Sequence, residues 1–187
     1  MNTPSVQCTR DEFDEMAATL VRSNGLWRLH RKKDSFERSV VWLEAVHIME
    51  RMGSVGNVER LLVTFFVSYS ECYSQPQLHL APEHPLDAER LSTYVAGACF
   101  HPRESCGCYE APLVTLGFCE ELEMTLWGLH PCDTAQLALM ASENGVRGNC
   151  LELFLLSVAP FVSMTEDLLP THATGMANHS GCPCDSG

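Results

Sequence analysis

The segment GLHPCDT, residues 128–134, places a cysteine directly after His130 and Pro131 and directly before a predicted helix. The reactive form of cysteine is the thiolate, and the free backbone N–H groups and dipole at a helix N-terminus favour that anion. Cys132 is therefore a candidate nucleophile. The alternative is that Cys132 is one more packed thiol among the ten cysteines of the chain, because a buried cysteine often serves as a small apolar residue.

The two residues before Cys132 have predicted roles of their own. Pro131 fixes the backbone torsion φ and so stiffens the approach to the cysteine. His130 is a candidate base or a structural residue that makes a hydrogen bond, and we favour the structural role because neighbouring side chains usually point apart. A cysteine hydrolase would need a histidine oriented by an Asp or Asn, and none of the eight histidines offers a convincing pattern.

Composition limits the domain number and the partners. A chain of 187 residues that is 45% hydrophobic predicts one domain with a substantial core. We expect a single domain over residues 1–170 and a disordered tail over residues 171–187, where hydrophobic periodicity is lost. The net charge is −12, and Arg147 is the only basic residue after Arg103. Such an acidic half repels phosphate, so nucleic acid and anionic membrane are poor partners.

Two further features predict the compartment. No apolar run reaches the ~18 residues that a membrane span requires. The first residues also lack the basic and apolar pattern of a secretory signal. We therefore expect a cytoplasmic protein without stable membrane insertion, whose cysteines are mostly reduced.

The clustered cysteines are the one candidate metal site. Cys106 and Cys108 have Cys99 and His101 nearby in the sequence, but the one-residue spacing of the pair is atypical of zinc sites. We expect loop thiols and no metal. The other closely spaced pair, Cys182 and Cys184, falls in the expected tail.

The first half of the chain predicts a helix followed by strands. Thr9 and Glu12 have the spacing of a capping box, and apolar residues then recur at helical spacing until Asn24 and Gly25 end the helix. Strands rich in β-branched and aromatic residues follow. They are LWRLHR (26–31), SVVWLEAVHIM (39–49), VERLLVTFFVSYS (58–70) and YSQPQLHL (73–80), with Pro76 restricting the last to an edge or a bulge.

The second half predicts mostly helices. We expect a helix over residues 87–100, a loop over 101–112, a short strand over 122–129, a helix behind Cys132 that is capped by Asp133, and a helix over 149–158 that ends at Pro160. This order indicates an α+β fold, in which helices cover one face of an antiparallel β-sheet meander.

Three segments carry a resemblance to a known family. GLHPCDT, FFVSYSECYSQPQLHL and LELFLLSVAPFV together resemble the autophagy branch of the ubiquitin-like conjugating enzymes, over about residues 58–170. The His-Pro-Cys motif is the specific part, and the hairpin residues Tyr69, Ser70, Tyr73, Pro76 and Leu78 add support in the right order. The resemblance implies a ubiquitin-conjugating-enzyme-like fold.

The resemblance also implies an activity and partners. Cys132 would accept a ubiquitin-like modifier of the autophagy-related protein 12 type as a thioester from an activating enzyme of the autophagy-related protein 7 type. It would then pass the modifier to a lysine of an acceptor of the autophagy-related protein 5 type. Thioester chemistry of this kind needs no cofactor. Tyr69 and Tyr73 are candidates for acceptor docking, or else they pack in the sheet.

The motif differs from that of general ubiquitin-conjugating enzymes, which carry Asn after His-Pro and the cysteine several residues later. That Asn stabilises the developing oxyanion, so here another donor is needed. Thr134, Asn144, Asn149 and the backbone N–H groups at the helix start are the candidates.

Two alternatives remain open. A relative in the same branch transfers its modifier to phosphatidylethanolamine, but this chain lacks a long acidic insert, and its first helix is flanked by acids rather than built as a basic membrane wedge. A non-catalytic scaffold with the same fold would have no need of the cysteine that this chain retains.

The lysine content suggests that a loaded enzyme would rarely modify itself. Lys32 and Lys33 are the only lysines, and we place them in the turn between the first two strands. A thioester reacts only with an amine that reaches it, so we expect a long-lived loaded form.

Overall fold

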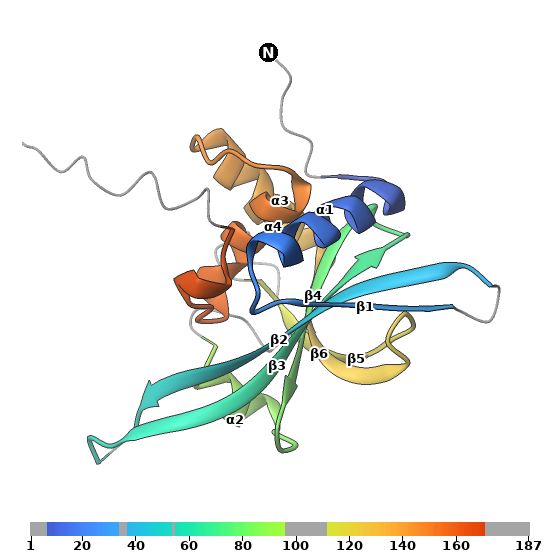
Figure 1. Cartoon of the computed structure of the whole chain (residues 1–187). Coiled ribbons are helices and arrows are strands. Elements are labelled where there is room, and N and C mark those ends of the chain that lie inside the picture. The colour runs from blue at the N-terminus through green and yellow to red at the C-terminus, as the bar shows by residue number, and fades with distance from the viewer. Residues whose placement is uncertain (1–6, 34–36, 54, 96–111, 171–187) are drawn as a thin grey trace, which may run out of the picture.

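The computed structural model describes residues 7–33, 37–53, 55–95 and 112–170. Its elements, labelled in Figure 1, are α1 (Arg10–Ser23), β1 (Arg28–Lys33), β2 (Ser39–Met52), β3 (Val58–Ser70), β4 (Gln75–Pro82), α2 (Ala88–Ser92), β5 (Val114–Cys119), β6 (Met124–Leu129), α3 (Pro131–Glu143) and α4 (Cys150–Val158), with 3-10 turns at Ala159–Phe161 and Glu166–Leu168. The expected tail over 171–187 and the cysteines at 99, 106, 108, 182 and 184 lie outside the described residues, as does His101.

The six strands form one antiparallel sheet in the order β1-β2-β3-β4-β6-β5. Helices α1, α3 and α4 lie on one side of it (Figure 1), so the predicted α+β architecture is confirmed. The first four strands form the expected meander. The last two depart from it, because β6 rather than β5 pairs with β4, through His79 with Gly128 and Leu80 with Trp127.

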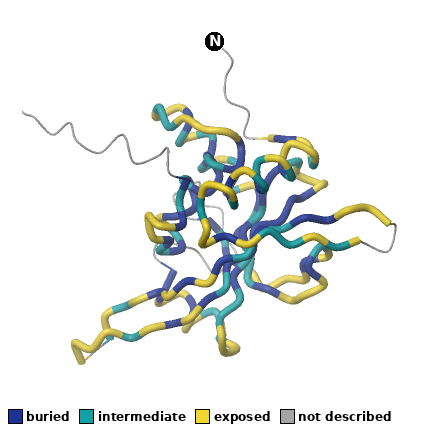
Figure 2. Tube along the Cα trace, viewed as in Figure 1, coloured by how far each residue is buried: buried dark blue, intermediate teal, exposed yellow. Residues whose placement is uncertain are grey.

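Alternation along the strands separates two apolar clusters. Side chains on the helix side, such as Leu43 and Phe65, are fully buried against the helices, including Phe13 of α1 and Leu155 of α4. Figure 2 shows the strands buried near the sheet centre and exposed toward the tips of the long β2–β3 arm. A smaller cluster on the opposite face packs the β5–β6 hairpin onto the sheet and consists of Phe66, Cys119, Leu122 and Leu126.

Helix α1 begins at the predicted capping box. The Glu12 N–H donates to Thr9 Oγ1 at 3.3 Å, and the Thr9 N–H donates to the Glu12 carboxylate at 2.7 Å. Such a cap satisfies N–H groups that have no partner within the helix. The apolar side of α1 then buries Phe13, Ala17 and Leu20.

Our prediction of a helix over residues 87–100 is wrong for residues 93–95, because α2 ends at Ser92. The Ser92 hydroxyl donates to the Glu89 carbonyl at 2.6 Å, and the Thr93 hydroxyl donates to the Arg90 carbonyl at 2.7 Å. Hydroxyl groups that bond to helix carbonyls compete with the next helical turn. The remainder of the expected helix, from residue 96, lies outside the described residues.

Strand β5 is an element that our sequence analysis misses. Its alternating Val114, Leu116 and Phe118 would have indicated a strand, but they follow directly on the expected loop. The strand lies at the edge of the sheet, and Leu116 and Phe118 are exposed there.

Two local predictions concern strand ends. Pro76 pairs with Tyr69 of β3, while β6 reaches only His79 and Leu80, so Pro76 lies on an unpaired edge of β4 as predicted.

The placement of Lys32 and Lys33 in a turn is wrong. Both belong to β1, because its pairing with β2 continues to Lys33 and Ser39.

Candidate active site

Cys132 lies in the first turn of α3, and its free thiol is exposed. Strand β6 ends at Leu129, and His130 is the N-cap of the helix, in place of the expected Asp133. The His130 Nδ1 atom accepts the Cys132 backbone N–H at 3.3 Å. His130 thus makes the kind of structural hydrogen bond that we favoured from the sequence.

Leu113, the residue before β5, bonds through its backbone N–H and carbonyl to two residues at the start of α3. The His130 N–H donates to the Leu113 carbonyl at 2.8 Å, and the Leu113 N–H donates to the Asp133 carboxylate at 2.8 Å. Asp133 therefore anchors the helix start to the strand segment instead of capping the helix. The strand, the cysteine and the helix consequently form one fixed unit, which is what a reacting group needs for orientation.

The Pro131 carbonyl receives two side-chain donors. The buried Gln75 side chain donates to it at 2.6 Å, and the Thr134 hydroxyl donates to it at 3.0 Å. Gln75 is the first residue of β4, so this bond joins the helix start to a second strand. Sequence analysis misses both Gln75 and Leu113, because nothing local in the sequence marks residues that act across such a distance.

The side chains expected to stabilise an oxyanion are placed elsewhere. Thr134 is only 1% exposed, and its hydroxyl donates to the Pro131 carbonyl. This placement corrects the expectation that Thr134 donates to the oxyanion beside Cys132. Asn144 caps the other end of α3, about 18 Å along a helix of this length at 1.5 Å per residue. Asn149 caps α4. The backbone N–H groups of Asp133 and Thr134 remain, and both bond to the one carbonyl of His130.

The two hairpin tyrosines have different environments. Tyr73 is 41% exposed, and its ring meets that of His130 edge-on, with 6.5 Å between the centroids. Tyr69 is buried, and its hydroxyl donates to the Cys8 carbonyl at 2.7 Å. The docking role expected for Tyr69 is therefore wrong, since the residue packs in the core, whereas Tyr73 lies at the surface beside the site.

A groove of about 640 Å³ begins at His130 and Pro131. It runs over the sheet face opposite the helices, where Gln77 and His79 of β4 and Gly128 of β6 line it. A side chain at position 128 would come within 3.1 Å of the His79 ring, so glycine allows β6 to approach β4 here. The groove gives an extended ligand a path to the residue immediately before Cys132.

Most of the other described cysteines are less accessible to a protein partner than Cys132. Cys8, Cys119 and Cys150 are buried, which leaves Cys72 and Cys132 as the exposed thiols in the ranges that the structure describes. Burial raises the pKa of the Cys119 thiol and keeps it protonated. Cys72 lies in the β3–β4 turn rather than at a helix start.

Two negative findings concern the described residues. No helix among them is long and apolar enough to cross a membrane. Over the same ranges, no three His, Cys, Asp or Glu side chains gather as a metal-binding group.

Comparisons with known proteins give a likeness at the level of structure. No protein-family model matches the chain, and no curated protein matches its sequence. A solved structure described as the autophagic E2, Atg10 is similar to this chain, with a TM-score of 0.43 and 10% sequence identity. The match covers 85% of this chain and 99% of that one.

Proposed function

We propose that the chain is a ubiquitin-like conjugating enzyme with Cys132 as its nucleophile. The observation that carries the proposal is an exposed thiol in the first turn of α3, at a helix start held by His130, Leu113 and Gln75. The bonds to β4 and to the segment before β5 fix the backbone position of Cys132.

The proposed reaction has two acyl transfers. The Cys132 thiolate attacks the thioester carbonyl that joins the modifier to the activating enzyme, and the enzyme's thiolate leaves. A lysine amine of the acceptor then attacks the new thioester, so that an amide bond forms, the Cys132 thiolate leaves and the amine loses a proton. No cofactor takes part.

Each transfer passes through an oxyanion that needs a donor. The N–H groups of Asp133 and Thr134 share the His130 carbonyl, at 3.1 and 3.2 Å. One of them can turn to the oxyanion while the other keeps the carbonyl paired. We therefore assign the oxyanion donor to the backbone of the first turn of α3.

The family resemblance supplies the specific partners of the proposal. They are a modifier of the autophagy-related protein 12 type, an activating enzyme of the autophagy-related protein 7 type and a lysine of an autophagy-related protein 5 type acceptor. The enzyme would thus be of the autophagy-related protein 10 type and act in the cytoplasm. Tyr73, exposed beside His130, is the proposed contact for the acceptor.

The test is a loading assay with activating enzyme, ATP and modifier, resolved on non-reducing gels. The wild-type chain should form a band that reductant removes. Cys132→Ser should form a reductant-resistant oxyester or no adduct, because a serine hydroxyl is a far weaker nucleophile than a thiolate. Cys72→Ser removes the second exposed thiol of the part of the chain that the structure describes, and it should load normally.

Two results would contradict the proposal, and each would contradict a different part of it. A reducible band that persists on Cys132→Ser and disappears from Cys72→Ser, Cys119→Ser or Cys150→Ser would overturn the assignment. Transfer of the modifier to phosphatidylethanolamine in vesicles, rather than to a protein lysine, would identify the lipid-conjugating alternative.

A further inference from the structure

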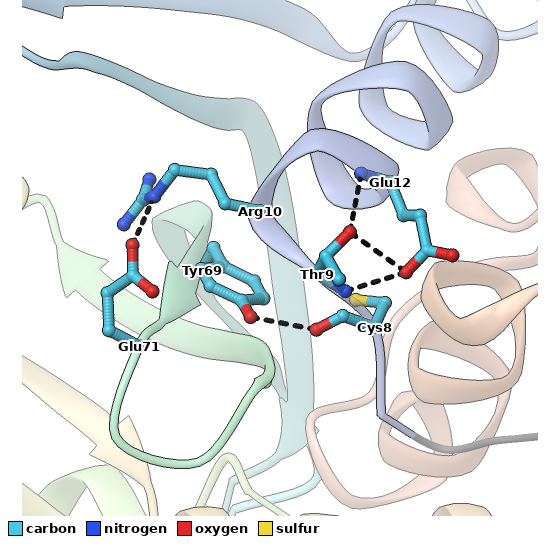
Figure 3. Close-up of polar contacts among 6 residues, drawn as sticks. All are labelled: Cys8, Thr9, Arg10, Glu12, Tyr69 and Glu71. Carbon is cyan, nitrogen blue, oxygen red and sulfur yellow. Dashed lines mark hydrogen bonds and ion pairs between the residues drawn. The ribbon is translucent and has the colours of Figure 1, made fainter.

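The segment before α1 connects the β3–β4 turn to the helices (Figure 3). The Cys8 N–H donates to the Ser74 carbonyl at 2.9 Å, and the Cys8 carbonyl accepts the Tyr69 hydroxyl at 2.7 Å. Arg10 bonds to Glu71 at 2.6 Å and lies over the Tyr69 ring. The backbone of Cys8 is therefore fixed on both of its polar groups.

The Cys8 side chain meets Cys150, the first residue of α4. Each thiol shifts the pKa of the other, and both residues line one groove. Cys150 is also fixed, because Asn149 and Glu152 form a capping box at the start of α4, with bonds of 2.9 and 3.0 Å. Two sulfur atoms from opposite ends of the described chain are thus held together by rigid backbone.

Small solutes can reach this pair. Cys8 and Cys150 are 8% and 7% exposed, and both line a groove of about 380 Å³ between α1 and the start of α4. Thiols that only fill space in a core have no such opening. The groove is separate from the one that begins at His130 and shares no lining residue with it.

The two thiols differ in acidity. The hydrogen bond from Cys150 lowers the pKa of Cys8, whereas the same contact and burial raise the pKa of Cys150. Cys8 is therefore the more acidic of the two thiols. A reactive thiolate next to a second thiol is the arrangement found in redox-sensing cysteines.

We propose that Cys8 and Cys150 are a redox-active pair, which a hydroperoxide converts to an intramolecular disulfide. The Cys8 thiolate attacks the peroxide oxygen, the O–O bond breaks, and the departing hydroxide takes a proton to leave as water. The Cys150 sulfur then attacks the resulting sulfenic acid. The S–S bond forms as the S–O bond breaks, and the hydroxyl leaves with the Cys150 proton as a second water. Two thiols are oxidised, and one peroxide is reduced to two waters.

The disulfide would fix more than the two cysteines. It would close a loop that contains the whole sheet and α3, and it would tie to α4 the segment that holds Ser74. Ser74 follows Tyr73, which contacts His130. Oxidation therefore stiffens one side of the Cys132 site, while the pair itself takes no part in conjugation.

Peptide mapping of the full-length chain tests the proposal with hydrogen peroxide as the probe. Trypsin and a glutamate-specific protease release residues 1–10 and 148–152, each with a single cysteine. The linked form of these two peptides should become the main disulfide product after peroxide and disappear with dithiothreitol. It should be absent from Cys8→Ser and Cys150→Ser and retained in Cys72→Ser and Cys132→Ser.

A second readout is thermal unfolding of the oxidised wild-type chain, which needs no variant that has to fold. Closing a loop of more than ~100 residues should raise the melting temperature by about 10 °C, and dithiothreitol should reverse the rise. The proposal is overturned if peroxide yields sulfinic or sulfonic acid at Cys8 without the linked peptide. It is also overturned if Cys8 and Cys150 both still react with iodoacetamide at a peroxide dose that has already oxidised Cys72 or Cys132.

Discussion

At the scale of single residues, the Cys132 site combines an exposed sulfur with a tightly held backbone. Its neighbours His130 and Pro131 each make bonds that reach outside α3, to Leu113 and Gln75. The sulfur can therefore meet large protein partners while its position stays defined. Side chains that touch the backbone of the site should consequently matter for activity even though none of them touches the substrate.

Replacing His130 separates a capping role from a role as base. Asparagine is a good N-cap and alanine is not, so His130→Asn should keep most of the stability and loading rate, whereas His130→Ala should lose about 1 kcal/mol of stability. Urea unfolding and the rate of thioester formation measure both. If His130→Asn loads as slowly as His130→Ala at equal stability, the imidazole acts chemically rather than as a cap.

Gln75 gives a second test of the held helix start. Gln75→Met keeps the length of the side chain but removes the bond to the Pro131 carbonyl, which should cost about 1 kcal/mol and slow loading. Gln77→Met, two positions along β4, is the matched control for stability, and it should leave the free energy of unfolding unchanged. Equal effects of the two variants would show that the bond to Pro131 has no special role.

At the scale of elements, the site depends on how closely β6 approaches β4. His79 of β4 lies under Gly128 of β6, with its ring 3.3 Å from the Ser68 hydroxyl. Burial lowers the pKa of His79 to about 4. The imidazole is therefore neutral in the folded protein down to mildly acidic pH, whereas in the unfolded chain it gains a proton near pH 6.5.

The sign of the pH effect follows from these two pKa values. Between pH 6.5 and 4 the unfolded state binds the proton and the folded state does not, so stability falls as the pH falls through this window. From pH 7 to pH 5 the wild-type chain should lose about 1 to 2 kcal/mol more than His79→Gln. Urea unfolding at both pH values measures the difference. Parallel losses in the two proteins would mean that His79 is protonated in the folded state.

Elements with a local signal are predictable from this sequence, and elements defined by distant contacts are not. The capping box at Thr9 and the alternating residues of β2 and β3 indicate their own structure. The place of β6 in the sheet depends on its pairing with the distant strand β4.

The candidate site likewise has a part that the local sequence predicts and a part that depends on distant contacts. The His-Pro-Cys motif marks the cysteine and the start of the helix. The contacts from Gln75 and Leu113 exist only in the folded chain. The burial of Tyr69 likewise follows from α1 packing on the sheet, which no pattern around Tyr69 reports.

At the scale of the whole molecule, the few paired lysines would protect the loaded form that we propose from modifying itself. The chain has two lysines, and both are in ion pairs, Lys32 with Glu123 at 3.3 Å and Lys33 with Glu37 at 2.7 Å. A protonated, paired amine is a poor nucleophile. Lys32 nevertheless lines the groove that begins at His130. Its pairing with Glu123 therefore matters more for preventing self-modification than the pairing of Lys33 with Glu37.

The thioester on Cys132 should therefore be long-lived without an acceptor. Correct placement of an amine is worth ~7 to 11 kcal/mol of barrier, and both lysines are held by ion pairs with acidic side chains. After the activating step is quenched, the reducible band should decay without a reductant-resistant product, and Glu123→Gln should increase any adduct at Lys32 relative to wild type. Rapid conversion of the wild-type chain to an adduct at Lys32 or Lys33, mapped by mass spectrometry, would contradict this.

The strand order also sets the sequence of events during synthesis on the ribosome. Strands β1 to β4 pair with their neighbours in the chain, so a nascent chain can form these hairpins as soon as they emerge. The start of α3 needs Leu113, β6 and Gln75 together, and the core beneath it needs α4, which emerges last. Under the proposed function, a chain that ends before α4 would carry the Cys132 thiol without the completed site, and it should not be loaded with the modifier.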